Sequence, residues 1–289
     1  MLGRLVQTRR LPAVAPTGNL EGMRAVEEAL RGVLDLRSGR GRFDVTRTRP
    51  APALADLVEH FWTVSWDLRG RDPHTQHTLP HPSVHLVAER DRSGVVGVLT
   101  GRFTRELEGK GRAFGIRFRP AGLHPFLGAP VASLTDRRVA VAEVFGPAGD
   151  RLVADLLAAT GQARLVAAAE AFLLARLPAA DPNVVRVNRV VDQIMADRDI
   201  TRVADVTGRS GIATRRLQRL FATYVGVTPK WVIRRARLHE AVERLNAGDA
   251  VDLAFLAREL GYFDQAHFAR DFRSAVGRPP AAYARSSPS

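Results

Sequence analysis

Gly211-Ile-Ala-Thr-Arg-Arg-Leu-Gln-Arg-Leu-Phe221 recurs, in altered form, as Gly261-Tyr-Phe-Asp-Gln-Ala-His-Phe-Ala-Arg-Asp-Phe272. Each copy is followed by a glycine and, three residues later, by a proline. Gly211 and Gly261 lie 50 residues apart, whereas the matching residues after them, such as Phe221 and Phe272, lie 51 apart. The later copy therefore has one inserted residue. Each copy reads as a short helix, a turn in which glycine is free to take positive φ, and a longer helix. The repeat therefore predicts two helix-turn-helix units.

The second helix of each copy has an apolar and a polar face. Leu217, Leu220 and Phe221 share one face of the first copy at helical spacing, and Phe268 and Phe272 do so in the second, so these side chains are expected to pack inward. Arginine can bind a guanine edge with two hydrogen bonds, glutamine can bind adenine, and alanine can contact a thymine methyl group. The polar faces supply the candidate DNA-binding residues, namely Arg215, Arg216, Gln218, Arg219, Gln265, Ala266, His267, Arg270 and Arg273.

A third helix is predicted between the copies, over Pro229–Asn246. Its 18 residues would span about 27 Å. That length approaches the ~34 Å between successive major-groove segments on one side of B-DNA. Arg234, Arg235 and Arg237 on this helix are expected to reach phosphates.

The segment Ile200–Arg285 resembles the tandem helix-turn-helix domain of AraC/XylS-type transcriptional regulators. Besides the two copies above, the resemblance is carried by the motifs Gly226-Val-Thr-Pro229, Arg234-Arg-Ala-Arg-Leu-His-Glu-Ala241, Leu256-Ala-Arg-Glu-Leu260 and Gly277-Arg-Pro-Pro-Ala-Ala-Tyr283. It implies double-stranded DNA as the partner. It assigns base-facing roles to Arg215, Gln218, Arg219, Gln265, Ala266, His267 and Arg270. The sequence contains no GxSxG, GxGxxG or Walker A motif, so no enzymatic activity and no cofactor are expected.

Two residues depart from the family pattern. Ala213 stands where a serine usually precedes the first recognition helix, so either Thr214 caps the helix or its start is weaker by about 1 kcal/mol. Phe263 stands where the second copy often has a small polar residue.

Composition agrees with a nucleic-acid partner. The net charge is +13, of which residues 183–289 carry +7, and this balance is typical of a protein that binds a polyanion. Arginine enrichment can also come from a GC-rich genome. The absence of cysteine excludes disulfides, cysteine nucleophiles and cysteine-ligated metals. No apolar run is long enough for a membrane helix, so a cytoplasmic protein with no membrane partner is expected.

The chain is predicted to be an α+β multidomain protein. Residues 183–289 form the all-α DNA-binding bundle, and residues 147–182 form a helical hairpin and linker. Residues 48–146 form a β-rich, sensor-like domain, a small barrel or sandwich, because short β-branched and aromatic runs alternate with Gly and Pro. Residues 1–47 form a partly disordered arm with a helix over Leu20–Leu36. Strands are expected over Phe61–Leu68, Ser83–Glu89, Gly94–Thr100 and Ala113–Arg119.

The β-rich block resembles the N-terminal domain of one AraC-like subfamily. The resemblance is carried by His60-Phe-Trp62, Leu79-Pro80 and Gly115-Ile-Arg-Phe-Arg-Pro120. It implies that this domain binds a small-molecule effector or mediates association with another protein. A second copy of the chain and RNA polymerase are the further candidate partners. Apolar residues in Leu152–Leu177 fit either a dimer contact or packing on the chain's own sensor domain. Four aromatic side chains could line a pocket but are expected to belong to the hydrophobic core instead, namely Trp62, Trp66, Phe118 and Phe126.

Two alternatives stay open. The first is a metal-dependent β-barrel enzyme that uses the cluster His74, His77, His81 and His85. If Pro80–Glu89 were one strand, then His81, His85 and Glu89 would share a face and are the candidate metal ligands. Their spacing matches no strong ligand signature, so hydrogen-bonded histidines are favoured and no metal is predicted. The second alternative is a sequence-independent DNA binder. The favoured reading is a sequence-specific regulator whose two recognition helices read adjacent major-groove segments and whose N-terminal domain modulates binding.

Overall fold

A computed structural model describes residues 9–10, 32, 34, 39, 41–247 and 252–286. The predicted helix over Leu20–Leu36 lies outside these residues, except for Gly32 and Leu34. Leu34 is buried, and its backbone N–H donates to the carbonyl oxygen of His77 over 3.0 Å. The described part of the predicted arm therefore contacts the β-rich part of the chain.

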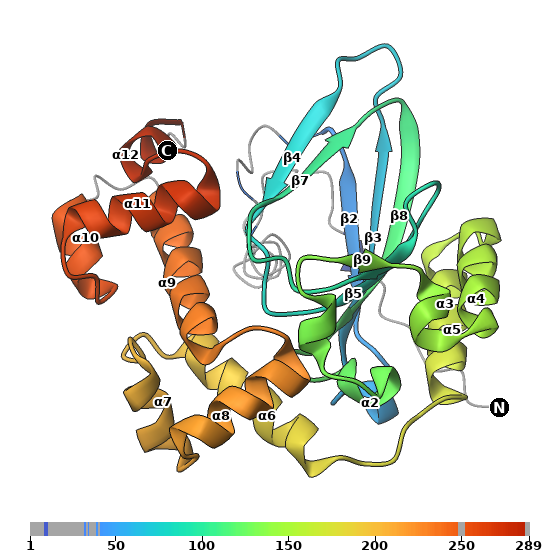
Figure 1. The fold of residues 1–289 in the computed structure, drawn as a ribbon. Helices are drawn as coiled ribbons and strands as arrows, with labels where there is room; N and C mark the ends of the chain where they lie inside the picture. Colours follow the sequence, from blue (N-terminus) through green and yellow to red (C-terminus); the bar gives the residue numbers. More distant parts are fainter. Residues whose placement is uncertain are drawn as a thin grey trace.

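The β-rich part contains a seven-stranded antiparallel sheet in the order β1-β2-β3-β8-β5-β6-β9 and a separate two-stranded ribbon of β4 and β7 (Figure 1). The strands are β1 (Arg9–Arg10), β2 (Asp44–Thr48), β3 (Val58–Asp67), β4 (His74–Thr78), β5 (His85–Glu89), β6 (Gly94–Val96), β7 (Phe103–Leu107), β8 (Lys110–Phe118) and β9 (Arg138–Val139). The four strands expected from the sequence are confirmed as β3, β5, β6 and β8 with shifted ends.

Alternation along β8 shows why the sheet has two different faces. Phe114, Ile116 and Phe118 are buried on one face, as the period of two predicts. On the other face, Gly115 pairs with Trp62, and a Cβ at Gly115 would lie 2.1 Å from the indole ring. Glycine is therefore required there for the close approach of the ring.

Short helices and the predicted helical hairpin cover the apolar face. They are η1 (Pro52–Leu54), α2 (His124–Leu127), η2 (Val131–Leu134), α3 (Val141–Phe145), α4 (Pro147–Ala158) and α5 (Gln162–Leu174). Leu156, Leu165 and Leu173 of the hairpin are buried in the same core as the sheet. Gln162 and Glu170 also bond to the β-rich part, since Oε1 of Gln162 accepts from Thr63 over 2.5 Å and Oε1 of Glu170 from the Ala51 N–H over 2.6 Å. The hairpin thus packs on the chain's own sheet.

The C-terminal part is helical throughout its described residues. It contains α6 (Pro182–Ala196), α7 (Val203–Ser210), α8 (Thr214–Leu220), a π-helical turn η3 (Phe221–Val225), α9 (Pro229–Asn246), α10 (Leu253–Glu259), α11 (Gln265–Val276) and α12 (Pro280–Ser286). The α+β architecture, with two helix-turn-helix units in the all-α part, is as predicted. The domain boundaries at residues 47/48, 146/147 and 182/183 stay a prediction.

Both helix-turn-helix units are packed against the N-terminal part. One core cluster runs from the sheet through α6 to α9, and includes Phe118, Leu217 and Phe221. A second cluster joins Leu34 and Leu79 to the aromatic side chains of α11 and α12. The β-rich part therefore touches the scaffold of each unit.

Candidate nucleic-acid interface

The first helix-turn-helix unit is formed by α7, a turn at Gly211 and α8. Gly211 has φ +67°, a conformation that glycine adopts at little cost. Leu217, Leu220 and Phe221 are buried, as their spacing predicts. The polar residues Arg215, Arg216, Gln218 and Arg219 of the same helix are all exposed.

The second unit is formed by α10, a turn at Gly261 (φ +69°) and α11. The carboxylate of Asp264 caps α11 by accepting from the backbone N–H of His267 over 2.6 Å. Phe268 and Phe272 are buried at the inner face. The candidate DNA-binding residues Gln265, Ala266, His267, Arg270 and Arg273 are all exposed.

The helix α9 holds the two units apart. It begins at Pro229, where the Thr228 hydroxyl accepts from the Trp231 N–H over 3.2 Å, and it has the bounds that the sequence predicts. Eighteen helical residues span about 27 Å. In Figure 1, α7 and α8 lie at one end of α9 and α10 to α12 lie at the other. The chain thus presents two exposed polar helix faces on one rigid spacer.

The expectation that three arginines of α9 reach phosphates is wrong for Arg235. This side chain is 3% exposed, and its guanidinium group donates to the carbonyl oxygen of Thr100 over 2.6 Å and stacks over the Trp231 ring. Burial, with the positive charge of Arg234 beside it, lowers the pKa of Arg235 to about 10. Arg235 therefore attaches α9 to the β-rich part of the chain.

The other two arginines that were expected to reach phosphates differ from each other. Arg237 is half-buried and lies 3.9 Å above the ring of Tyr262, so it stabilises the second unit and does not face solvent freely. Arg234 is exposed, and its guanidinium group donates to the Asp271 carboxylate of α11 over 2.7 Å. Of these three arginines, only Arg234 keeps the exposure that a phosphate contact requires.

Several contacts between the two parts of the chain gave no signal in the sequence. The Arg102 guanidinium donates to the Val276 carbonyl oxygen at the end of α11 over 2.9 Å. The Thr135 hydroxyl donates to the Gly226 carbonyl oxygen over 2.6 Å. His81 stacks on His239, with ring centroids 4.1 Å apart. Gly226, and Gly277 directly after Val276, belong to the repeat that the sequence shows. The residues that contact these two places, Thr135 and Arg102, come from the N-terminal part of the chain.

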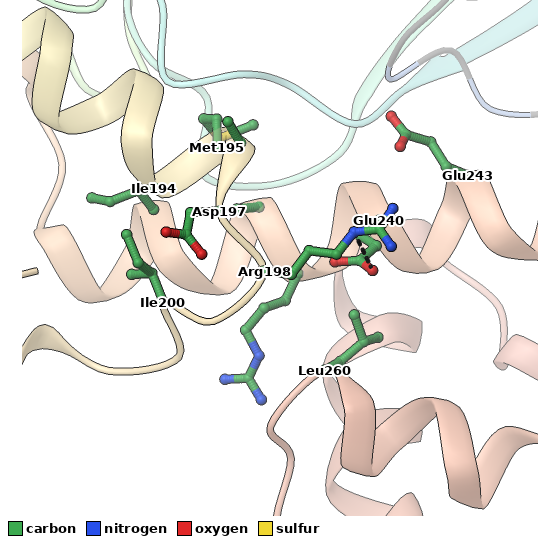
Figure 2. Close-up of a pocket in the computed structure, with 11 residues that line it drawn as sticks. Ile194, Met195, Asp197, Arg198, Ile200, Glu240, Glu243 and Leu260 are labelled. Atoms are coloured by element: carbon green, nitrogen blue, oxygen red, sulfur yellow. Dashed lines mark ion pairs between the residues drawn. The ribbon is translucent and has the colours of Figure 1, made fainter. Parts of the chain in front are cut away.

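A small cavity lies inside the C-terminal part, between the end of α6, α9 and the end of α10 (Figure 2). Its volume is about 100 Å³. The Arg198 Nε lies 3.1 Å from Glu240 Oε1 at its rim, and the same carboxylate accepts from Arg244 over 2.6 Å. Arg198 and Glu240 of the lining are thus paired with each other, and the cavity brings together none of the candidate DNA-binding residues.

The metal-ligand hypothesis for His81, His85 and Glu89 is wrong in its geometry. The strand begins only at His85, so His81 lies outside it and stacks on His239 of α9. His85 accepts a hydrogen bond from the Trp62 indole over 3.2 Å, and Glu89 pairs with Arg105. Over the described residues, no three histidine, aspartate or glutamate side chains are grouped so that they could hold a metal ion.

His74 and His77 lie apart from this set. His74 is buried on β4 with its ring 3.3 Å from the Gln76 side-chain oxygen, and His77 lies 3.0 Å from the Thr104 hydroxyl. Both histidines are hydrogen-bonded within the β4–β7 ribbon.

No helix in the described ranges has the length and apolar character needed to cross a membrane.

Two segments of the chain match known domain families. Residues 206–286 match a helix-turn-helix domain family, and residues 46–140 match a domain of unknown function, DUF6597. No curated protein matches the chain.

Solved structures that the chain matches include ToxT from Vibrio cholerae O395, at 12% identity over 85% of this chain and 97% of that chain, with a TM-score of 0.34. ToxT from Vibrio cholerae strain SCE256, bound to an unsaturated fatty acid, is 11% identical over 84% of this chain and 94% of that chain, with a TM-score of 0.31. The xylose-binding transcription activator XylR is 17% identical over 54% of this chain and 41% of that chain, with a TM-score of 0.30.

The helix-turn-helix match, together with two exposed polar helix faces, defines a DNA-binding transcriptional regulator. Its C-terminal domain is of the AraC type, as the sequence motifs predicted.

Proposed function

We propose that α8 and α11 enter two successive major-groove segments on one side of a DNA duplex, with α9 as the spacer. The observation that carries this proposal is that the polar faces of both helices are exposed while their apolar faces are buried. A spacer of about 27 Å brings the two faces near the ~34 Å repeat of the groove.

The exposed side chains divide into two roles. Arg215, Gln218 and Arg219 of α8 face base edges in one segment, because their donors match guanine and adenine. The residues Gln265, Ala266, His267 and Arg270 of α11 do so in the other. The residues Arg216, Arg273 and Arg234 bind phosphates and fix the orientation of the protein on the duplex.

We propose further that the N-terminal part modulates binding through its direct contacts with the second unit and with the spacer helix α9. Arg102 bonds to the end of α11, and Thr100 accepts from Arg235 of α9. A ligand or a second copy of the chain that moves the loop between β6 and β7 would move α11 relative to α8. This gives the effector a physical route to the DNA-binding surface.

Site selection from random duplexes with the full chain tests the reading of bases. Arg215→Ala should cost about 1–3 kcal/mol of specific binding and relax base preference in one half of the site, and Arg270→Ala should do so in the other half. Arg189→Ala is the matched control, because Arg189 is an exposed arginine of α6 outside both recognition helices. Unchanged selectivity in both variants would contradict the proposal.

Competition against random duplex separates a regulator from a sequence-independent binder. A specific regulator prefers its site by at least about 10³-fold. A ratio near one would support the sequence-independent alternative.

A further inference from the structure

The second helix-turn-helix unit displays an aromatic side chain that its fold does not use. Phe263 is 93% exposed, and the next most exposed aromatic side chain among the described residues is Phe255, at 51%. A phenyl ring in water is unfavourable, and a nearly fully exposed ring makes almost no contact with its own chain. Its position therefore needs an explanation outside the packing of the unit.

Comparison of the two turns shows that Phe263 is the extra residue of the second copy. In the first unit, only Ile212 lies between Gly211 and Ala213, the residue before α8, and its partly buried side chain packs on the core. In the second unit, Tyr262 and Phe263 lie between Gly261 and the capping residue Asp264.

Tyr262 takes the core position of Ile212. It is 5% exposed, with its ring 5.3 Å from that of Phe268. Phe263 is therefore not needed to close the turn, and it points its ring to solvent at the start of α11.

The surroundings of Phe263 favour DNA as its partner. It comes directly before Asp264, whose cap fixes the start of α11, and two residues before Gln265, the first exposed residue of that helix. Two exposed arginines of the same unit, Arg258 and Arg270, can bind phosphate groups of a duplex. An apolar ring at the edge of a base-reading surface is suited to the methyl group of thymine, which projects into the major groove.

We propose that Phe263 packs against the 5-methyl group of a thymine at the edge of the groove segment read by α11. This inference rests on the proposed function, because it requires α11 to lie in the major groove. It adds a second apolar base contact beside the one assigned to Ala266, from a residue that has no counterpart in the first unit, so the two half-sites differ in thymine dependence.

Substitution of uracil for thymine tests the contact, because it removes only the methyl group. Each thymine of the selected site is replaced in turn, and binding of the full chain to each duplex is measured. At the thymine that Phe263 contacts, we expect wild type to lose about fourfold in affinity, the effect of one buried methyl-sized group. Phe263→Ala should bind the unmodified duplex more weakly and lose nothing further at that uracil, whereas Phe263→Leu should keep part of the sensitivity. A thymine contacted by Ala266 should keep its uracil effect in Phe263→Ala.

Phe255→Ala is the matched control, since Phe255 is an exposed phenylalanine of the same unit, and it should keep the full uracil effect. Equal binding by wild type and Phe263→Ala would overturn the inference, and so would a uracil effect that is undiminished at every thymine in Phe263→Ala. If Phe263→Ala binds DNA normally but lowers transcription in vitro, the ring contacts a protein and the inference is also wrong. If Arg270→Ala loses base selectivity while Phe263→Ala binds DNA like wild type, only the Phe263 contact is rejected. If neither variant changes in affinity or base selectivity, the proposed function is rejected as well.

Discussion

The guanidinium group of Arg102 donates a 2.9 Å hydrogen bond to the carbonyl oxygen of Val276, the last residue of α11. Carbonyl groups at a helix C-terminus lack intrahelical donors and carry the negative end of the helix dipole, so an arginine is a favourable partner. Arg102 belongs to the β-rich part, between β6 and β7. A single side chain thus ties a proposed recognition helix to the other half of the chain.

Gly277, which follows Val276, should be unusually sensitive to substitution. It has φ +94°, and a Cβ there would lie 2.1 Å from Nη1 of Arg102, whereas Gly211 has φ +67° and open space around it. Gly211→Ala should cost about 1–2 kcal/mol of unfolding free energy from backbone strain alone. Gly277→Ala should cost about 1 kcal/mol more, because Arg102 must give up its hydrogen bond.

Urea denaturation of the full chain measures both costs. In an Arg102→Ala background the excess cost of Gly277→Ala should vanish, while the cost of Gly211→Ala should not change. The same excess in both backgrounds would mean that Arg102 is not the group that Gly277 accommodates.

The start of α8 should be open to improvement. Ala213 precedes this helix with no side-chain cap, whereas Asp264 caps α11. Ala213→Ser should raise the unfolding free energy by about 1 kcal/mol, and Asp264→Ala should lower it by a similar amount. Thermal and urea unfolding of both variants check this, and a neutral Ala213→Ser would show that the first turn of α8 gains nothing from a cap.

Two half-buried histidines should make the protein sensitive to mild acid. Burial, with Arg117 and Arg47 nearby, lowers the pKa of His60 to about 2 and that of His85 to about 3. The Nδ1 atom of His85 accepts a hydrogen bond from the indole of Trp62, and a ring nitrogen that accepts carries no proton, so this hydrogen bond requires the neutral ring.

The direction follows from proton uptake by the unfolded chain. Unfolded histidines bind protons below pH 6.5, whereas His60 and His85 stay neutral in the folded protein, so folded stability is full above pH 6.5 and falls as the pH drops toward 3. Each histidine should lower the unfolding free energy by on the order of 1 kcal/mol for each pH unit that the pH falls within this window. Unfolding free energies at pH 7 and pH 5 should show the loss, and His85→Gln should reduce the slope. A flat profile between these pH values would be inconsistent with rings that stay neutral in the folded protein.

Salt dependence should separate the two kinds of arginine on α11. Arg273 is assigned to a phosphate and Arg270 to a base, and both are exposed. Arg273→Ala should weaken binding to all duplexes equally and reduce the slope of log K against log salt by about 1. Arg270→Ala should instead reduce the difference in affinity between the specific duplex and a random duplex. Fluorescence anisotropy at several salt concentrations measures both, and a change of base preference in Arg273→Ala would contradict its assignment.

Local patterns predicted the helical half of the protein well. The bounds of α9 and the inward residues Leu217 and Phe268 follow from proline, capping and 3.6-residue periodicity, which act within a few turns of chain. The proposed strand through His81 failed for a local reason too, because Pro80 and Pro82 lack the N–H groups that a sheet requires. The strand therefore begins only at His85.

The sequence by itself determined two helix-turn-helix units, their buried and exposed faces and the spacer between them, because each depends on residues close together in the chain. Only the tertiary structure decided that Arg235 is buried under Thr100, that Arg102 holds the end of α11 and that Phe263 stays in solvent. An arginine or a phenylalanine on a helical segment has the same periodicity whether a remote strand covers it or not. Its environment is set by which distant segments pack against it, and that information is not local.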